Sequence, residues 1–279
     1  MSLRFIPIIL FGVYLAYYWF ANQENVPITG RSQLIDISRE QEEALGLQSY
    51  QDILSRSAVL TDGEVVDQVR SIGRKLVDAA RIEGIDPGFE WEFNVIRSDQ
   101  ANAFALPGGK VAVYTGLLPI AENADGLSAI MGHEIAHAIA RHGAERMAYQ
   151  KLIRIGSMAA ALVVGDMGYS AQKAVMGAFG VGSQYGVLLP FSRKHETESD
   201  FIGLRLLARA CFDPGEAPKL WQRMAEHAGR NSGSEFMSTH PSPQTRIEQF
   251  EAWLPEAREL GMKNCSNTRS GRGQRTFKP

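Results

Sequence analysis

Two histidines and a glutamate lie close together near the middle of the chain, in the segment His133-Glu134-Ile135-Ala136-His137. On a helix, residues four apart differ by about 40° around the axis, so both imidazoles would point to one side and could share a metal ion. Glu134 would lie beside them, where a carboxylate can take a proton from a water molecule on that metal. The spacing therefore predicts a hydrolytic metal site.

A helix is predicted to carry this motif, because apolar residues recur around it at helical spacing. Asn123 or Asp125 can cap its start, and we expect it to end at Gly143, with Arg141 and His142 in its last turn. The alternative is a pair of surface histidines. The apolar sequence argues against that alternative, since polar groups are costly to bury without a partner.

A third metal ligand is required, and His142 is a poor candidate. It follows His137 by five residues, which rotates it by about 140° around the helix, away from the shared ion. Glu196 is the better candidate, because its helical stripe also holds Asp200 and then Gly203, a residue that permits close helix approach. We expect Glu196 to bind the metal and Asp200 to accept the free N–H of a ligating imidazole.

The neighbours of Glu196 are expected to be exposed. Glu198 lies on a stripe that is mostly charged, and His195 has the pattern of a surface residue.

The chain resembles metallopeptidase family forty-eight, the gluzincins that include HtpX, the CAAX prenyl proteases and the Oma-type quality-control proteases. The resemblance covers roughly residues 40–255, and four segments carry it: NAFALPGGKVAVYTGLL (102–118), HEIAHAIARHGAE (133–145), FSRKHETESDFIG (191–203) and THPSPQTRI (239–247). It implies one zinc ion on His133, His137 and Glu196, with Glu134 as the general base. Asp200 matches the aspartate of the family pattern, and Ser199 stands where alanine is more usual.

The last of these segments adds two site residues. By resemblance, His240 lies near the metal, where it either stabilises the developing oxyanion or occupies the fourth zinc position in a resting state. Arg246 is a candidate for a carboxylate or oxyanion contact.

The fold class predicted from the sequence is α+β, a mostly helical zincin-like metalloprotease with a small three-stranded sheet. Helical patterns cover residues 39–55 and 62–82, and alternating or short apolar runs at 91–95, 102–106 and 110–115 indicate strands. The hairpin would present an edge strand to an extended peptide through main-chain hydrogen bonds. The predicted substrate-binding residues are Asn102, Ala103, Phe104 and Ala105.

Two apolar stretches, at residues 155–164 and 174–191, separate His137 from Glu196. The first is too short to span a bilayer, and the second is rich in glycine. We expect helices that cover or gate the active cleft, in preference to a contact with the membrane surface.

The two ends of the chain differ in character from its average. Residues 5–21 contain no charge, and Arg4 precedes them, so the positive-inside bias places the N-terminus in the cytoplasm and the remainder outside. A cleaved signal segment and a buried helix are the alternatives. The chain has 29 basic and 31 acidic residues, and five of the basic ones follow residue 260. The first 260 residues therefore carry 24 basic against 31 acidic residues, a net charge of −7 that argues against nucleic acid as a partner.

These observations predict three segments: a membrane anchor (residues 1–25), a zinc metalloprotease domain (26–260) and a basic, disordered tail (261–279). The expected function is cleavage of misfolded or misassembled membrane or envelope proteins. The protease would face away from the cytoplasm, in the periplasm if the source is bacterial. The alternative is a membrane-anchored chaperone or assembly factor with a latent zinc site occluded by His240. Whether Cys211 and Cys265 pair stays open.

Overall fold

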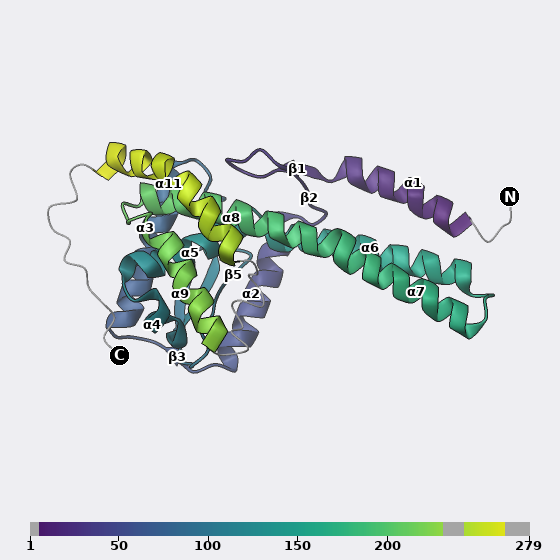
Figure 1. Cartoon of the computed structure of the whole chain (residues 1–279), viewed down its shortest axis with the longest axis horizontal. Coiled ribbons are helices and arrows are strands. Elements are labelled where there is room, and N and C mark those ends of the chain that lie inside the picture. The colour runs from purple at the N-terminus through teal and green to yellow at the C-terminus, as the bar shows by residue number, and fades with distance from the viewer. Residues whose placement is uncertain (1–5, 231–242, 266–279) are drawn as a thin grey trace. The chain divides into compact units, whose positions relative to one another are not determined.

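A computed structural model describes residues 6–230 and 243–265 of the 279-residue chain (Figure 1). The polypeptide divides into two compact units, and each is described by itself. The first unit comprises residues 1–38 and 141–195, and the second comprises residues 39–140 and 196–279. The predicted segment boundaries at residues 25 and 260 differ from this division and stay a prediction.

A mixed four-stranded sheet lies in the second unit, with strand order β3-β4-β6-β5. The strands are β3 (Val59–Leu60), β4 (Glu92–Ile96), β5 (Ala103–Leu106) and β6 (Lys110–Tyr114). The three predicted strands are confirmed, and the short β3 adds a fourth. β4 and β6 are parallel, whereas β5 and β6 form an antiparallel hairpin. Gly108 and Gly109 make its tight turn with φ of 80° and 78°, a backbone conformation that glycine adopts most readily.

Helices surround this sheet and form most of the second unit. They are α2 (Arg39–Ser55), α3 (Glu64–Ile82), α4 (Leu118–Ala121), α5 (Ala124–Ile139), α9 (Glu216–Arg230) and α11 (Pro243–Cys265), together with α8 (Leu189–Arg209) from Glu196 onward. The predicted helices at 39–55 and 62–82 are α2 and α3. A Cβ on Gly73 of α3 would lie 2.4 Å from the ring of Phe93, so α3 approaches β4 closely because residue 73 has no side chain.

The helix α5 contains the whole His133–His137 motif. The side chain of Asn123 accepts a hydrogen bond of 2.9 Å from the backbone N–H of Gly126 and so caps the helix start. The helix ends at Ile139, earlier than predicted, because Arg141 adopts a left-handed backbone with φ of 57°. The expectation that His142 lies in the last turn is wrong, since His142 begins the next helix, α6 (His142–Val164).

α5 and α8 pack closely at two glycines. A Cβ built on Gly203 would lie 3.0 Å from the backbone carbon of Gly132 and from the nitrogen of His133. A Cβ on Gly132 would lie 2.6 Å from the side chain of Leu207. The two backbones can approach this closely only because both positions lack side chains.

A disulfide joins Cys211, just after α8, to Cys265, the last residue of α11. The pairing that the sequence left open is therefore present, at a sequence separation of 54. α11 continues through residues 261–265, so the helix includes the first five residues of the segment predicted to be a tail. The remainder of that segment, residues 266–279, lies outside the described residues.

The first unit consists of helices and a small ribbon. Its helices are α1 (Ile6–Ala21), α6, α7 (Tyr169–Ser183), a π-helical turn (Gln184–Leu188) and the first residues of α8. The strands β1 (Gln23–Asn25) and β2 (Ser32–Leu34) pair antiparallel. Ion pairs hold this ribbon to α6: Arg31 contacts Glu145 at 2.7 Å, and Asp36 contacts Lys151 at 2.5 Å.

We predict that Gly203→Ala separates α5 from α8 and destabilises the protein by about 1–3 kcal/mol, the usual cost of overpacking a core. The matched control is Gly261→Ala in α11, where a new Cβ would meet only ordinary contacts at 3.5 Å. Denaturant unfolding of both variants measures the difference. Equal stability of the two variants would contradict the close approach described above.

Candidate active site

Three potential metal ligands converge between α5 and α8. His133 and His137 come from α5 and Glu196 comes from α8, and one ligand atom from each lies within 4.8 Å of the others. The Nε2 atoms of the two histidines are 3.0 Å apart. Oε2 of Glu196 lies 3.4 Å from Nε2 of His133, and Oε1 lies 3.5 Å from Nε2 of His137. Among the described residues this is the group that could hold a metal ion.

The donor set fits zinc. Two imidazole nitrogens and a carboxylate oxygen are typical of catalytic zinc sites, with the fourth position left for water or substrate. Bond lengths of about 2.0–2.2 Å in a tetrahedron place ligand atoms roughly 3.3–3.5 Å apart, close to the separations seen here. A cation would also reduce the cost of burying Glu196, which is nearly inaccessible to solvent.

Asp200 orients His133 toward this group. Nδ1 of His133 lies 2.9 Å from Oδ1 of Asp200, and both side chains are buried. Because a carboxylate only accepts, Nδ1 carries the proton of this hydrogen bond, and Nε2 faces the other ligand atoms. This is the relationship that the helical stripe of Glu196 and Asp200 predicted.

Arg246 on α11 binds both acids at once. Its Nε and Nη2 donate to the two oxygens of Asp200 at 2.6 and 2.5 Å, and its Nη1 donates to Glu196 at 3.0 Å. Of the two roles considered for Arg246, the contact with carboxylates is the one present in the structure. Guanidinium geometry suits this bidentate contact, and its fixed charge offsets that of two buried acids.

Trp221 on α9 supports Arg246, and sequence reasoning did not identify it. The guanidinium carbon lies 3.4 Å from the centre of the Trp221 ring. The same ring lies edge-on to His133, with ring centres 6.0 Å apart. Nothing in the sequence around Trp221 marks it, since a buried tryptophan on an amphipathic helix is ordinary core composition.

Glu134 faces the edge of the sheet. Its side chain is buried, and Oε2 accepts a hydrogen bond of 3.2 Å from the backbone N–H of Ala105 on β5. β5 is the last strand in the sheet order, and within the described part of the chain no strand pairs with its outer side. Three of the predicted substrate-binding residues, Ala103, Phe104 and Ala105, lie on this strand, and Asn102 immediately precedes it.

Two expectations about exposure are wrong. Glu198, expected on a solvated face, is only 6% exposed, although it is not part of the ligand group. His195, expected at the surface, is 5% exposed. Burial is tolerated at His195 because its Nε2 lies 2.9 Å from a carboxylate oxygen of Glu145, and its ring stacks on His142 with centres 3.9 Å apart. Arg31 binds the same carboxylate through two hydrogen bonds. Glu145 therefore connects the β1–β2 ribbon to His195, the residue that precedes Glu196.

His240 lies outside the described residues, so its role stays a prediction.

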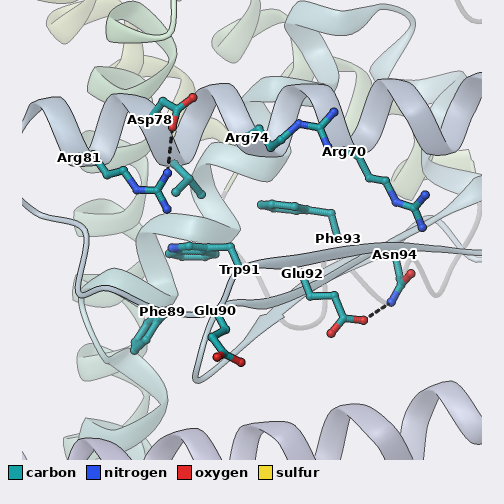
Figure 2. Close-up of a pocket in the computed structure, with 11 residues that line it drawn as sticks. Arg70, Arg74, Asp78, Arg81, Phe89, Glu90, Trp91, Glu92, Phe93 and Asn94 are labelled. Atoms are coloured by element: carbon teal, nitrogen blue, oxygen red, sulfur yellow. Dashed lines mark hydrogen bonds and ion pairs between the residues drawn. The ribbon is translucent and has the colours of Figure 1, made fainter.

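A cavity of about 580 Å³ lies in the second unit, between α3 and β4 (Figure 2). Arg70, Arg74 and Arg81 line it from α3, and the nearly parallel rings of Trp91 and Phe93 line it from the β4 side. None of the candidate metal ligands lines this cavity. Asp78, Glu90 and Glu92 also line it, but the group of His, Cys and acidic residues that could hold a metal ion lies elsewhere, at His133, His137 and Glu196.

A buried helix with two histidines and a glutamate, a glutamate on a second helix and an adjoining sheet edge together define a zincin-like metallopeptidase. Comparison with known sequences agrees. Residues 65–254 match Peptidase family M48, and the chain belongs to that family.

The chain is 38% identical over 252 residues to the mitochondrial metalloendopeptidase OMA1 of Schizosaccharomyces pombe, covering 89% of this chain and 72% of that protein. It is 31% identical over 271 residues to the human mitochondrial metalloendopeptidase OMA1, covering 94% and 52% of the two chains. The beta-barrel assembly-enhancing protease of Escherichia coli is 28% identical over 274 residues, covering 91% and 54%. The protein is thus a metalloendopeptidase of family M48.

Arg246→Lys should weaken zinc binding by about 10–100-fold, because lysine keeps the charge but cannot bind both oxygens of Asp200 while reaching Glu196. Zinc affinity is measured by competition with a chelator, and thermal unfolding reports whether the variant folds. The control is Arg205→Lys on α8, whose arginine pairs with the exposed Glu256. Equal zinc affinity of the two variants would show that Arg246 does not orient the ligands.

Zinc binding should also depend on pH. Burial and the charge of Arg246 lower the pKa of His133, but hydrogen bonds to Asp200 and Glu196 outweigh them and raise it to about 9. His133 is therefore protonated below that pH in the metal-free protein, and zinc must displace this proton. We expect affinity to fall roughly tenfold per pH unit below 9, or about a hundredfold from pH 8 to pH 6.

Chelator competition at pH 6 and pH 8 checks this dependence. Asp200→Asn removes one carboxylate that raises the pKa of His133, so this variant should show a shallower slope. An affinity that does not change with pH in the unmodified protein would contradict the prediction.

Proposed function

We propose that the protein is a zinc endopeptidase that cleaves misfolded or misassembled membrane or envelope proteins. The observation that carries this proposal is the hydrogen bond from Ala105 on β5 to Glu134. It places an open strand edge, where an extended peptide can pair, against the carboxylate next to the ligand group.

His133, His137 and Glu196 would hold the zinc ion. Asp200 would orient His133, and Arg246 would orient Glu196. Zinc bound there would polarise the scissile carbonyl and lower the pKa of a water molecule. Together, those two effects would promote hydrolysis of a peptide bond near neutral pH.

The protein residues supply orientation and proton transfer. β5 aligns the substrate backbone, so that the scissile bond lies beside Glu134. Glu134 takes the proton of the attacking water and passes it to the departing amine. His240 would either donate a hydrogen bond to the oxyanion or occlude the resting site.

Selection of unfolded segments follows from the way β5 would bind. Main-chain hydrogen bonds to a strand edge require an extended peptide and leave side-chain choice loose. The relatives include a beta-barrel assembly-enhancing protease and mitochondrial metalloendopeptidases, which supports a role in the quality control of membrane or envelope proteins.

The proposed location is the outer face of the cytoplasmic membrane, with α1 as the anchor. α1 is apolar throughout, and most of its large side chains are exposed. Arg4 before this helix favours a cytoplasmic N-terminus. The Cys211–Cys265 disulfide supports an oxidising compartment for the protease, such as the periplasm of a bacterium.

Glu134→Gln should lower casein cleavage by about 10²–10⁴-fold without loss of zinc, since the amide cannot accept the proton. The measurement uses the full chain, with zinc per chain determined alongside the cleavage rate. Glu198→Gln is the control, because this buried carboxylate lies outside the ligand group. Cleavage that is unchanged in Glu134→Gln would refute the catalytic assignment.

The same assay separates the two roles of His240. A lower rate of casein cleavage in the His240→Ala variant would support the oxyanion role. A higher rate would support the latent site of a chaperone or assembly factor.

A further inference from the structure

The cavity between α3 and β4 takes no part in the site of chemistry. It lies wholly within the second unit and has a volume of about 580 Å³. Ligand pockets in proteins commonly measure about 300–1,000 Å³. Three arginines of α3 lie on one side of the cavity, and two aromatic rings lie on the other (Figure 2). A ligand that fits must therefore match both positive charge and an apolar surface.

The arginines of the cavity differ in how they are neutralised. Arg81 forms ion pairs with Asp78 at 3.0 Å and with Asp86 at 2.9 Å. Arg70 donates one hydrogen bond of 3.5 Å to a backbone oxygen, and no carboxylate among the described residues forms an ion pair with Arg70 or Arg74. These two residues are four apart on α3 and so lie on the same side of the helix. Two positive charges are thus available to a ligand.

The glutamates beside the cavity do not offset these charges. Figure 2 shows Glu90 and Glu92 on the side of β4 that faces away from α3, whereas Trp91 and Phe93 lie on the side that faces it. This arrangement is the normal alternation of side chains along a strand. Glu92 also lies 3.7 Å from the ammonium group of Lys110. The side of the cavity that faces α3 therefore carries an excess of positive charge.

The aromatic rings form a fixed apolar surface next to the arginines. The planes of the Trp91 and Phe93 rings differ by 6°, and their centres are 6.4 Å apart. The indole N–H of Trp91 donates a hydrogen bond of 3.0 Å to Asp86, which holds the ring in place. Phe93 is buried beneath Gly73, whereas Trp91 is half-buried. Trp91 is therefore the ring that a ligand can contact.

We propose that this cavity binds an acidic segment of a polypeptide substrate, with its carboxylates on Arg70 and Arg74 and an apolar side chain on Trp91. The inference rests on the proposed function, because it takes the ligand to be part of a substrate. Guanidinium groups bind carboxylates through paired, charge-assisted hydrogen bonds. An aromatic or aliphatic side chain gains contact area on an indole ring.

Two other occupants fit the cavity less well. Phosphate groups of nucleotides commonly bind at helix N-termini, whereas Arg70 and Arg74 lie within the body of α3, which begins at Glu64. The C-terminal residues of the chain itself, 266–279, include four basic residues and no acidic one. Their charge has the same sign as that of the arginines, so an acidic polypeptide is the better match.

The sheet connects the cavity to the strand edge at the active site. Ala105 of β5 pairs with Val111 of β6, and Val111 pairs with Phe93 of β4. Neighbouring strands are about 4.8 Å apart, so the backbones of Ala105 and Phe93 are about 10 Å apart. A peptide on the outer side of β5 lies one strand spacing further away, and at least about five more extended residues would span the distance to β4. A second contact at the cavity would thus favour long, unfolded substrates.

The test uses the full chain in detergent solution, labelled with fluorotryptophan and observed by fluorine NMR. The chain has four tryptophans, of which Trp91 reports on the cavity and Trp221 on the Arg246 side of the metal site. The variant Trp91→Phe assigns the cavity signal. The probe is the blocked peptide acetyl-Gly-Asp-Phe-Asp-Gly-amide, and the control peptide has asparagine in place of both aspartates.

We expect the acidic peptide to shift the Trp91 signal saturably and to bind at least about fivefold more tightly than the asparagine peptide. Arg74→Gln should weaken binding of the acidic peptide by about five- to tenfold, because a charge-assisted hydrogen bond is lost. The matched control is Lys75→Gln, which removes the same charge from the next residue of α3. The ammonium group of Lys75 lies outside the cavity, 5.6 Å from the centre of the Phe212 ring. An unchanged Trp253 signal shows that each variant is folded.

Four outcomes would overturn the proposal. They are a shift at Trp221 without one at Trp91, equal binding of the two peptides, equal affinity of the Arg74→Gln and Lys75→Gln variants, and tighter binding of ATP than of the acidic peptide. The last would make a nucleotide the occupant. None of these readouts depends on cleavage, so failure here with casein cleavage intact is distinguishable from failure of the catalytic proposal.

Discussion

The close approach of α5 and α8 at Gly132 and Gly203 is the constraint on which the ligand group depends. His133 follows the first glycine directly, so its imidazole can reach Glu196 and Asp200 only if the α8 backbone lies nearby. A side chain at either glycine would occupy the space that now separates the helices. The Asn123 cap fixes where α5 begins, and the Cys211–Cys265 disulfide ties the chain after α8 to the end of α11. Features of α5, α8 and α11 thus act together to set the distance between α5 and α8.

The charged side chains that meet between α5 and α8 offset one another. Glu196 and Asp200 are two buried carboxylates, and Arg246 supplies one positive charge over the face of Trp221. In the metal-free protein the proton on His133 supplies the second positive charge. A zinc ion would displace that proton and add a larger positive charge. Burial without such partners would be prohibitive, so ligands and supporting residues form one electrostatic unit.

The sequence predicts features that depend on residues close together along the chain. Alternation and helical periodicity identified β4, α3 and the helix of the motif, and shared stripes on one helix brought Glu196 and Asp200 to one side. The burial of His195 could not be predicted in this way, because its partner Glu145 is 50 residues away in the sequence. The helix break at Arg141 was not predicted either, and the guanidinium of this residue contacts Glu24, which is 117 residues away. The role of Trp221 depends on Arg246, and neither residue signals the other in sequence.

The two units of the chain differ in composition. The sheet, α5 and α8 from Glu196 onward belong to the second unit, whereas residues 141–195 belong to the first. The inserted segment, residues 141–195, begins at Arg141, whose backbone is left-handed, and ends within the continuous helix α8. Between residues 155 and 192 it contains only two charged residues, Asp166 and Lys173. A near-neutral average over the whole chain conceals such local differences, because the five basic residues after position 260 offset most of the net charge of −7 on residues 1–260.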